Sequence, residues 1–185
     1  ILGHIYSLVI SKGEIFVLGI FFGTTSIGIY SGAQKLIQPL HTISHSILTI
    51  SFPNLIKKIG SVNTKYFRKI SVYILLITIF ISSSIFLCRD ILVEFLLGNE
   101  YKESASIISV LIWSLILVSL YHVRKKYLIT INNSFIYRYY AISGSLITFF
   151  LLLIFTYFYG MIGTAIGFTA SMFISLFILP LFLNT

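Results

Sequence analysis

The final 47 residues of the chain, 139–185, contain no Asp, Glu, Lys or Arg. One helix needs about 20 apolar residues to cross the hydrocarbon core of a bilayer, so this stretch is long enough for about two crossings. Over the whole chain 57% of the residues are hydrophobic, 10% are charged and the mean hydropathy is +1.00. These values are far from those of globular proteins. The sequence therefore predicts an all-α integral membrane protein.

Five breaks divide the 185 residues into six apolar segments, so we expect six transmembrane helices in a single lobe over residues 1–185. The chain begins with Ile1 and enters an apolar segment at once, without the features of a secretory signal. We therefore expect a fragment of a longer protein. The predicted helices are residues 1–22, 27–52, 70–88, 104–123, 139–159 and 164–183.

The connections between these segments alternate in charge. Nine of the 13 basic residues flank the connections after the second and fourth segments, whereas the connection after the third is acidic. Because Lys and Arg accumulate in cytoplasmic loops, we expect both chain ends in the cytoplasm. The same signal accounts for most of the net charge of +8, so membrane lipids and not nucleic acid are the expected partners. The nine basic residues are Lys57, Lys58, Lys65, Arg68, Lys69, Arg124, Lys125, Lys126 and Arg138.

Small residues recur one turn apart in three places, which allows helix backbones to approach closely. The pairs are Gly19 with Gly23, Gly28 with Gly32 and Gly163 with Gly167. We interpret these pairs as sites of packing within the molecule.

Ionisable residues near the middle of an apolar helix are costly and commonly functional. The first segment contains two of them, Lys12 and Glu14. Two residues apart, they do not pair along their own helix. Glu14 is a candidate for coupling transport to a proton or cation such as sodium, or alternatively a partner for a basic residue elsewhere in the bundle.

The second segment has a polar stripe along one face. Gln34, Gln38, His41 and His45 are spaced i, i+4, i+7 and i+11, within roughly 60° of one another on a helix. This pattern favours a water-filled cavity over hydrogen bonds between helices. Lys35, Thr42 and Thr49 widen the stripe, and Pro39 should kink the helix beside it.

A cavity lined by Lys12, Lys35, His41 and His45 favours an anionic ligand, and the histidines would gain charge as pH falls. A metal ion shared by His41 and His45 is the rival interpretation, but no Cys or carboxylate accompanies them on that helix. We therefore expect no metal and no cofactor. No nucleophile elbow, phosphate-binding loop or paired carboxylate lies near a crossing, so we do not expect an enzyme.

Two runs carry a resemblance to a known family. They are Glu14-Ile-Phe-Val-Leu-Gly-Ile-Phe-Phe-Gly and Ser26-Ile-Gly-Ile-Tyr-Ser-Gly-Ala-Gln-Lys-Leu-Ile-Gln-Pro-Leu40. They resemble the start of the C-terminal half of Wzx-type O-antigen and polysaccharide repeat-unit flippases, in the multidrug/oligosaccharidyl-lipid/polysaccharide exporter superfamily. Phe52-Pro-Asn-Leu and Phe95-Leu-Leu-Gly-Asn-Glu-Tyr-Lys-Glu-Ser-Ala resemble two later helix boundaries of that family.

The resemblance implies the C-terminal lobe of a twelve-helix transporter in the bacterial inner membrane. Its substrate would be an undecaprenyl-pyrophosphate-linked oligosaccharide, with Lys12 and Lys35 offsetting the charge of the pyrophosphate and polar groups holding the sugar. Members commonly have an Asp-Arg pair before Phe16, and here Glu14 keeps the acid while Ile15 replaces the base. The alternatives are a cation-coupled drug exporter of the same superfamily, a polysaccharide polymerase, or a purely structural membrane subunit.

Overall fold

The chain forms long helices with little connecting structure. The computed structural model describes residues 2–59, 64–130 and 134–183, and within them the side chains of residues 12–43, 46, 49, 69, 71–124, 139 and 142–177. Among these described residues, four helices are long and apolar enough to cross a membrane, which confirms the all-α membrane class. The elements are α1 (Leu2–Ile59), α2 (Thr64–Leu96), the short 3-10 helix η1 (Asn99–Tyr101), α3 (Lys102–Thr130) and α4 (Ser134–Leu183).

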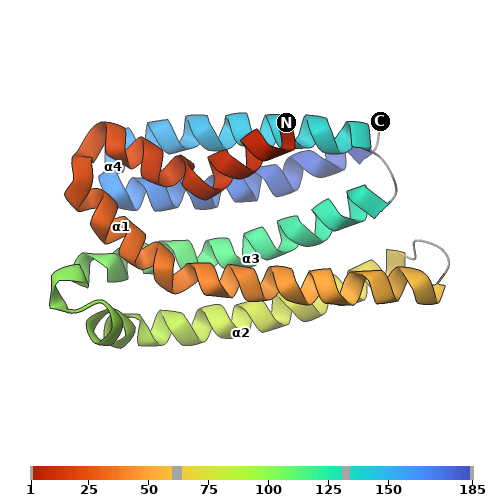
Figure 1. The fold of residues 1–185 in the computed structure, drawn as a ribbon, viewed down its shortest axis with the longest axis horizontal. Coiled ribbons are helices and arrows are strands. Elements are labelled where there is room, and N and C mark those ends of the chain that lie inside the picture. The colour runs from red at the N-terminus through yellow and green to blue at the C-terminus, as the bar shows by residue number, and fades with distance from the viewer. Residues whose placement is uncertain (1, 60–63, 131–133, 184–185) are drawn as a thin grey trace.

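Helix α1 turns back on itself (Figure 1). Two helical segments meet at Gly23, whose φ of 74° and ψ of −170° are non-helical. A positive φ is readily adopted by glycine, which has no Cβ. We call residues 2–22 the first arm of α1 and residues 24–59 its second arm. The sequence predicts a connection of four residues here, whereas a single non-helical glycine makes the turn and the helix resumes at the next residue.

Helix α4 turns back in the same way at Gly160, which has a φ of 60° and a ψ of −139°. Residues 134–159 form its first arm and residues 161–183 its second arm. In both helices the turn lies where the sequence predicts a short connection, because the glycine there relieves the steric conflict that other residues would meet at positive φ.

The two arms of α4 are in very close contact. A Cβ on Gly163 would collide with the carbonyl oxygen of Phe155, and a Cβ on Gly167 would lie 2.9 Å from the carbonyl oxygen of Leu151. The predicted packing role of Gly163 and Gly167 within the molecule is therefore confirmed.

A threonine pair adds a polar contact between the same arms. The hydroxyls of Thr156 and Thr164 are 2.9 Å apart and hydrogen-bonded, and both side chains are fully buried. Thr164 is also 3.1 Å from the carbonyl oxygen of Gly160. The two arms of α4 are therefore joined next to the turn by close backbone packing and by a hydrogen bond between two hydroxyl groups.

The end of α2 is capped before the chain enters α3. The N–H groups of Leu97 and Gly98 both donate to the carbonyl oxygen of Val93, at 2.9 and 3.1 Å, and Gly98 has a φ of 90°. This arrangement satisfies a carbonyl that the helix end would leave free. Glu103 lies in the first turn of α3, where a negative charge complements the helix dipole.

The turns within α1 and α4 and the connection from α2 to α3 lie at one end of the bundle. Figure 1 shows the turn of α1, η1 and the turn of α4 at the left, and the C-terminal end of α1, the start of α2, the end of α3 and the start of α4 at the right. The acidic connection and the two charge-free turns therefore share one end, and the helix ends rich in Lys and Arg share the other. Both ends thus have the charge that the sequence pattern predicts for opposite sides of a membrane.

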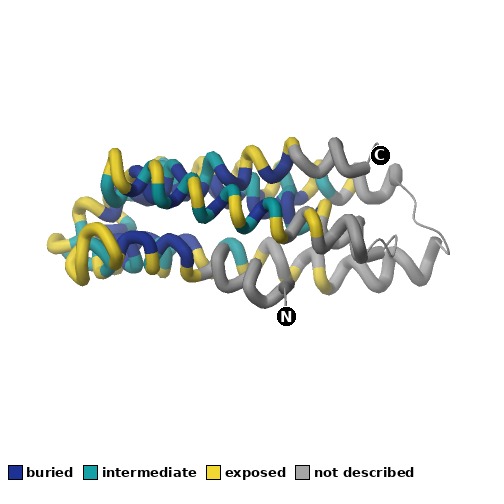
Figure 2. Tube along the Cα trace, turned by 90° about the horizontal axis from the view of Figure 1, so that it is seen from above, coloured by how far each residue is buried: buried dark blue, intermediate teal, exposed yellow. Residues whose placement is uncertain are grey.

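Helix α3 forms the centre of the bundle and contacts α1, α2 and α4. In the apolar 18-residue stretch of α3, 61% of the residues are buried. The corresponding share is 17% in α2 and 22% in each of α1 and α4. The outer helices expose large apolar side chains, such as Phe80 at 74% and Phe158 at 70%, and Figure 2 shows the exposed outer faces. Lipid is the expected environment of these faces.

A hydrogen bond joins α3 to the second arm of α4. Nη1 of Arg124 donates to the backbone carbonyl of Leu176. In an α-helix this carbonyl would accept from the N–H four residues later, but residue 180 is a proline, which has no N–H. The guanidinium of Arg124 therefore supplies the donor that Pro180 lacks.

Candidate functional site

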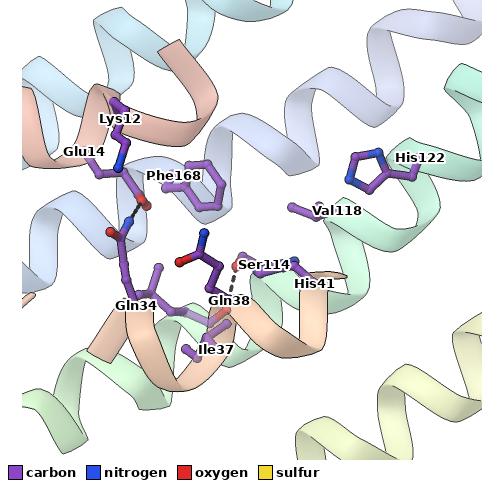
Figure 3. A pocket seen from close by; sticks show the side chains of 11 residues that line it. Lys12, Glu14, Gln34, Ile37, Gln38, His41, Ser114, Val118, His122 and Phe168 are labelled. Carbon is purple, nitrogen blue, oxygen red and sulfur yellow. Dashed lines mark hydrogen bonds between the residues drawn. The ribbon is translucent and has the colours of Figure 1, made fainter. Parts of the chain in front are cut away.

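A half-open cavity of about 230 Å³ lies between both arms of α1, the middle of α3 and the second arm of α4 (Figure 3). Its lining combines polar and apolar side chains, although the helices around it are strongly apolar. The lining residues are Lys12, Glu14, Gln34, Ile37, Gln38, His41, Leu111, Ser114, Val118, His122 and Phe168.

Glu14 connects the two arms of α1 at one end of this cavity. Its carboxylate is 3% exposed and accepts a hydrogen bond of 2.8 Å from the hydroxyl of Tyr30. Nε2 of Gln34 donates to the other carboxylate oxygen. Both donors belong to the second arm, one turn apart, because the turn at Gly23 brings the arms side by side. Among the side chains that the structure describes, the partners of Glu14 are therefore neutral hydrogen-bond donors and not a basic residue.

The polar stripe of the second arm faces this cavity in part. Gln34, Gln38 and His41 all line the cavity, together with Ile37 between them. Nδ1 of His41 is buried and has no hydrogen-bond partner within the described part of the chain. A buried ring nitrogen without a partner costs free energy of about 1–3 kcal/mol.

Helices α3 and α4 complete the cavity with residues that the sequence did not single out. Ser114 and His122 come from α3, and Phe168, 6% exposed, comes from the second arm of α4. In Figure 3 Gln38 and Phe168 point toward one another across the cavity, and His122 lies at the end opposite Lys12. Helical spacing groups residues within one helix but does not reveal which faces of different helices meet.

Comparison with known proteins identifies the family. Residues 1–106 match a family described as polysaccharide biosynthesis protein, which is more than half of the 185 residues. The chain belongs to this family. No curated protein and no solved structure matched the chain. The matched residues include both arms of α1, and membership in the polysaccharide biosynthesis family indicates a role in polysaccharide synthesis or export.

Not every predicted site residue of this polysaccharide biosynthesis protein lines the cavity. Lys35 is exposed and is absent from the lining, because one helical step turns it about 100° from Gln34. The side chain of His45 lies outside the described residues. Pro39 is exposed and within the second arm, and the non-helical backbone of α1 is at Gly23 and not at Pro39. Thr42 is exposed and donates to the carbonyl of Gln38 on its own helix.

The charges that line the cavity balance one another. Lys12 is the single basic residue of the described lining and Glu14 the single acidic one. His41 and His122 both line the cavity, but no group of three or more His, Cys, Asp or Glu suited to a metal occurs among the described residues. The arrangement offers hydrogen-bond donors and acceptors in a partly enclosed space, which is suited to binding a polar ligand.

Proposed function

We propose that this protein moves undecaprenyl-pyrophosphate-linked oligosaccharide repeat units across the bacterial inner membrane, for the synthesis of O-antigen or capsule. The observation that carries the proposal is a half-open cavity with polar side chains in its lining, between apolar helices, in a member of the polysaccharide biosynthesis family. The polar head of such a substrate must pass the apolar core of the bilayer, and an unpaired hydroxyl there costs several kcal/mol. A polar cavity lowers this cost by offering hydrogen bonds.

The proposed architecture is one lobe of a twelve-helix transporter. Each of α1 and α4 consists of two helical segments joined at a glycine, so that with α2 and α3 the chain would cross the membrane six times. The end with the basic helix termini would face the cytoplasm. Two such lobes that rock around a central site would expose the cavity to each side in turn.

In this proposal the protein performs no covalent chemistry. Glu14 is the candidate ion-coupling residue, since it is the one carboxylate among the described residues that line the cavity. Exchange of a proton or sodium ion at this carboxylate would change its hydrogen bonds to Tyr30 and Gln34, and with them the contact between the arms of α1.

A cation-coupled drug exporter of the same superfamily is the second candidate. The carboxylate of Glu14 in the cavity favours it, because cationic drugs bind acidic residues. The ammonium group of Lys12 in the same cavity opposes it. A polysaccharide polymerase is a third possibility within the same family description, and the same experiment separates all three.

The test is to disrupt the full-length gene in its native host and to profile lipid-linked oligosaccharides together with surface polysaccharide. Single repeat units that accumulate on lipid at the cytoplasmic face, with loss of surface polymer, support the flippase. Surface lipid that carries one repeat unit points to a polymerase. Unchanged glycans with altered drug sensitivity point to the drug exporter.

Two lysines of α1 provide a matched test of the cavity. Lys12 lines the cavity and Lys35 is exposed outside it. In the complemented strain, Lys12→Gln should lower surface polysaccharide at least about fivefold at equal protein level, equivalent to about 1 kcal/mol, since it leaves the described lining of the cavity with a net negative charge. Lys35→Gln should leave the polymer unchanged. Equal effects of both substitutions would contradict the assignment of the cavity.

A further inference from the structure

The charge of the cavity does not suit a pyrophosphate. With neutral histidines, the formal charges of the described lining residues sum to zero, from Lys12 and Glu14. A pyrophosphate carries more than one negative charge and would meet a single ammonium group close to a buried carboxylate. Repulsion between like charges is strong in a partly desolvated site. The second cation that the sequence suggests, Lys35, is exposed and outside the lining.

The polar groups that remain are suited to hydroxyl groups. Gln38 presents an amide that both donates and accepts, and the hydroxyl of Ser114 keeps acceptor capacity while it donates to the carbonyl of Leu111. The imidazole of His41, which also lines the cavity, can donate or accept a hydrogen bond. Sugar hydroxyls also donate and accept, so they match this mixture better than a group that only accepts.

The size of the cavity and its aromatic lining residue are suited to one sugar ring. Its volume of about 230 Å³ is below the roughly 300–1,000 Å³ of pockets for drug-sized ligands. Phe168 contributes the ring of an aromatic side chain opposite Gln38. A sugar ring has an apolar C–H face and polar edges, so it can place the first on Phe168 and the second toward Gln38 and His41.

We propose that this cavity is a subsite for a single uncharged sugar ring of the transported glycan, and that the pyrophosphate is held outside it. The inference rests on the proposed function, because that function supplies the glycan. His41 and Gln38 recognise hydroxyl groups, Phe168 supports the face of the ring, and the hydrogen bonds from Tyr30 and Gln34 keep the carboxylate of Glu14 at the wall of the site.

The test is saturation-transfer NMR on the purified full-length protein in nanodiscs of phosphatidylethanolamine and phosphatidylglycerol, which avoids detergents that carry sugar. The probes are methyl glycosides of neutral hexoses, of N-acetylhexosamines and of hexuronic acids, with inorganic pyrophosphate as competitor. The variants are Gln38→Leu and His41→Gln, and the matched controls on the same helix are Lys35→Gln and Thr42→Val. Thermal unfolding of each variant shows whether it is folded.

We expect at least one neutral glycoside to bind and not to be displaced by pyrophosphate. Gln38→Leu and His41→Gln should each weaken this binding about fivefold or more, as expected for the loss of one hydrogen bond to the ligand. The controls should bind like the wild type. If the His41 variant is unfolded, Gln38→Leu alone decides the result.

Three results would overturn the inference. One is that no neutral glycoside binds. Another is that pyrophosphate or the hexuronide binds more tightly than every neutral glycoside and displaces it. The third is equal binding by the folded Gln38 variant and the wild type.

The outcome is separable from that of the proposed function. Accumulation of repeat units on lipid after gene disruption, without binding of a neutral glycoside, would leave the flippase in place and remove the subsite. Binding of a glycoside without such accumulation would leave a sugar site and remove the flippase.

Discussion

The two long helices of this protein make the same turn and hold it in different ways. In both α1 and α4 a glycine of positive φ joins two arms. The arms of α4 are in backbone contact at Gly163 and Gly167. The arms of α1 are joined by side chains around Glu14, beside a cavity.

The difference indicates a structural role for the contact between the α4 arms and a functional role for the contact between the α1 arms. Small residues allow the backbones of the two α4 arms to meet at Gly163 and Gly167, where an added Cβ would clash. The α1 arms are connected by hydrogen bonds to a carboxylate, which can be broken and remade when the charge or the ligand changes. We therefore expect substitutions at the contact between the arms of α4 to affect stability first and substitutions around Glu14 in α1 to affect transport first.

The largest expected effect lies in the backbone contact of α4. Gly163→Ala should lower the free energy of unfolding by about 3 kcal/mol or more, since the added Cβ would collide with the carbonyl of Phe155. The control is Gly28→Ala in α1, where a Cβ would meet nothing within 4 Å and helix propensity favours alanine. Thermal unfolding in lipid nanodiscs measures both, and equal stability of the two variants would contradict the comparison.

Removal of one hydrogen bond from the carboxylate of Glu14 is the next test. Tyr30→Phe should lower the free energy of unfolding by about 1–2 kcal/mol, because the buried carboxylate loses a donor. Surface polysaccharide should fall by more than the amount of folded protein does. The exposed Tyr157 provides the control, and Tyr157→Phe should change neither quantity. Loss of polymer in strict proportion to protein would make Tyr30 a merely structural residue.

The bond between Arg124 and Leu176 allows a rescue experiment on the second arm of α4. Arg124→Ala should destabilise the protein by about 1 kcal/mol, because the carbonyl of Leu176 loses its donor. Pro180→Ala restores a backbone N–H four residues after that carbonyl. Arg124→Ala should therefore cost less when Pro180→Ala is also present. Additive effects in the double-mutant cycle would show that the two residues do not act on the same carbonyl.

The smallest expected effect concerns the threonine pair of α4. Thr156→Val removes one hydroxyl of the Thr156–Thr164 hydrogen bond while it keeps the shape of the side chain. We expect a loss of about 0.6 kcal/mol in the free energy of unfolding, the average for such bonds in a membrane protein. Transport should be unchanged. A loss of transport with normal stability would give the contact between the arms of α4 a part in function, contrary to the comparison.

Much of the fold follows from hydropathy and from glycine. Apolar runs locate the helices because burial in lipid requires long uncharged segments, and Gly23 and Gly160 lie where those runs break. The helices extend beyond the predicted segments, as α2 does at both ends, because polar residues can continue a helix outside the hydrocarbon core. The sequence also overestimates the length of the two short turns, since a single residue outside the helical region reverses each helix.

The candidate site was predictable only within one helix. The spacing of Gln34, Gln38 and His41 places them on one face, and all three line the cavity. Tyr30 lies four residues before Gln34 on the same face, so its spacing could have identified it as a member of the stripe. Ser114, His122 and Phe168 belong to other helices, and no spacing within α1 indicates them.

The partners of Glu14 bear on how the protein enters the membrane. Tyr30 and Gln34 follow Glu14 by 16 and 20 residues, so during synthesis the first arm of α1 is complete before either donor exists. A lone helix with a charged residue at its centre pays about 3 kcal/mol to insert into lipid. Two arms inserted together carry the acid and both of its donors. The helical hairpin, and not the single helix, is therefore the expected unit of membrane insertion at this end of the chain.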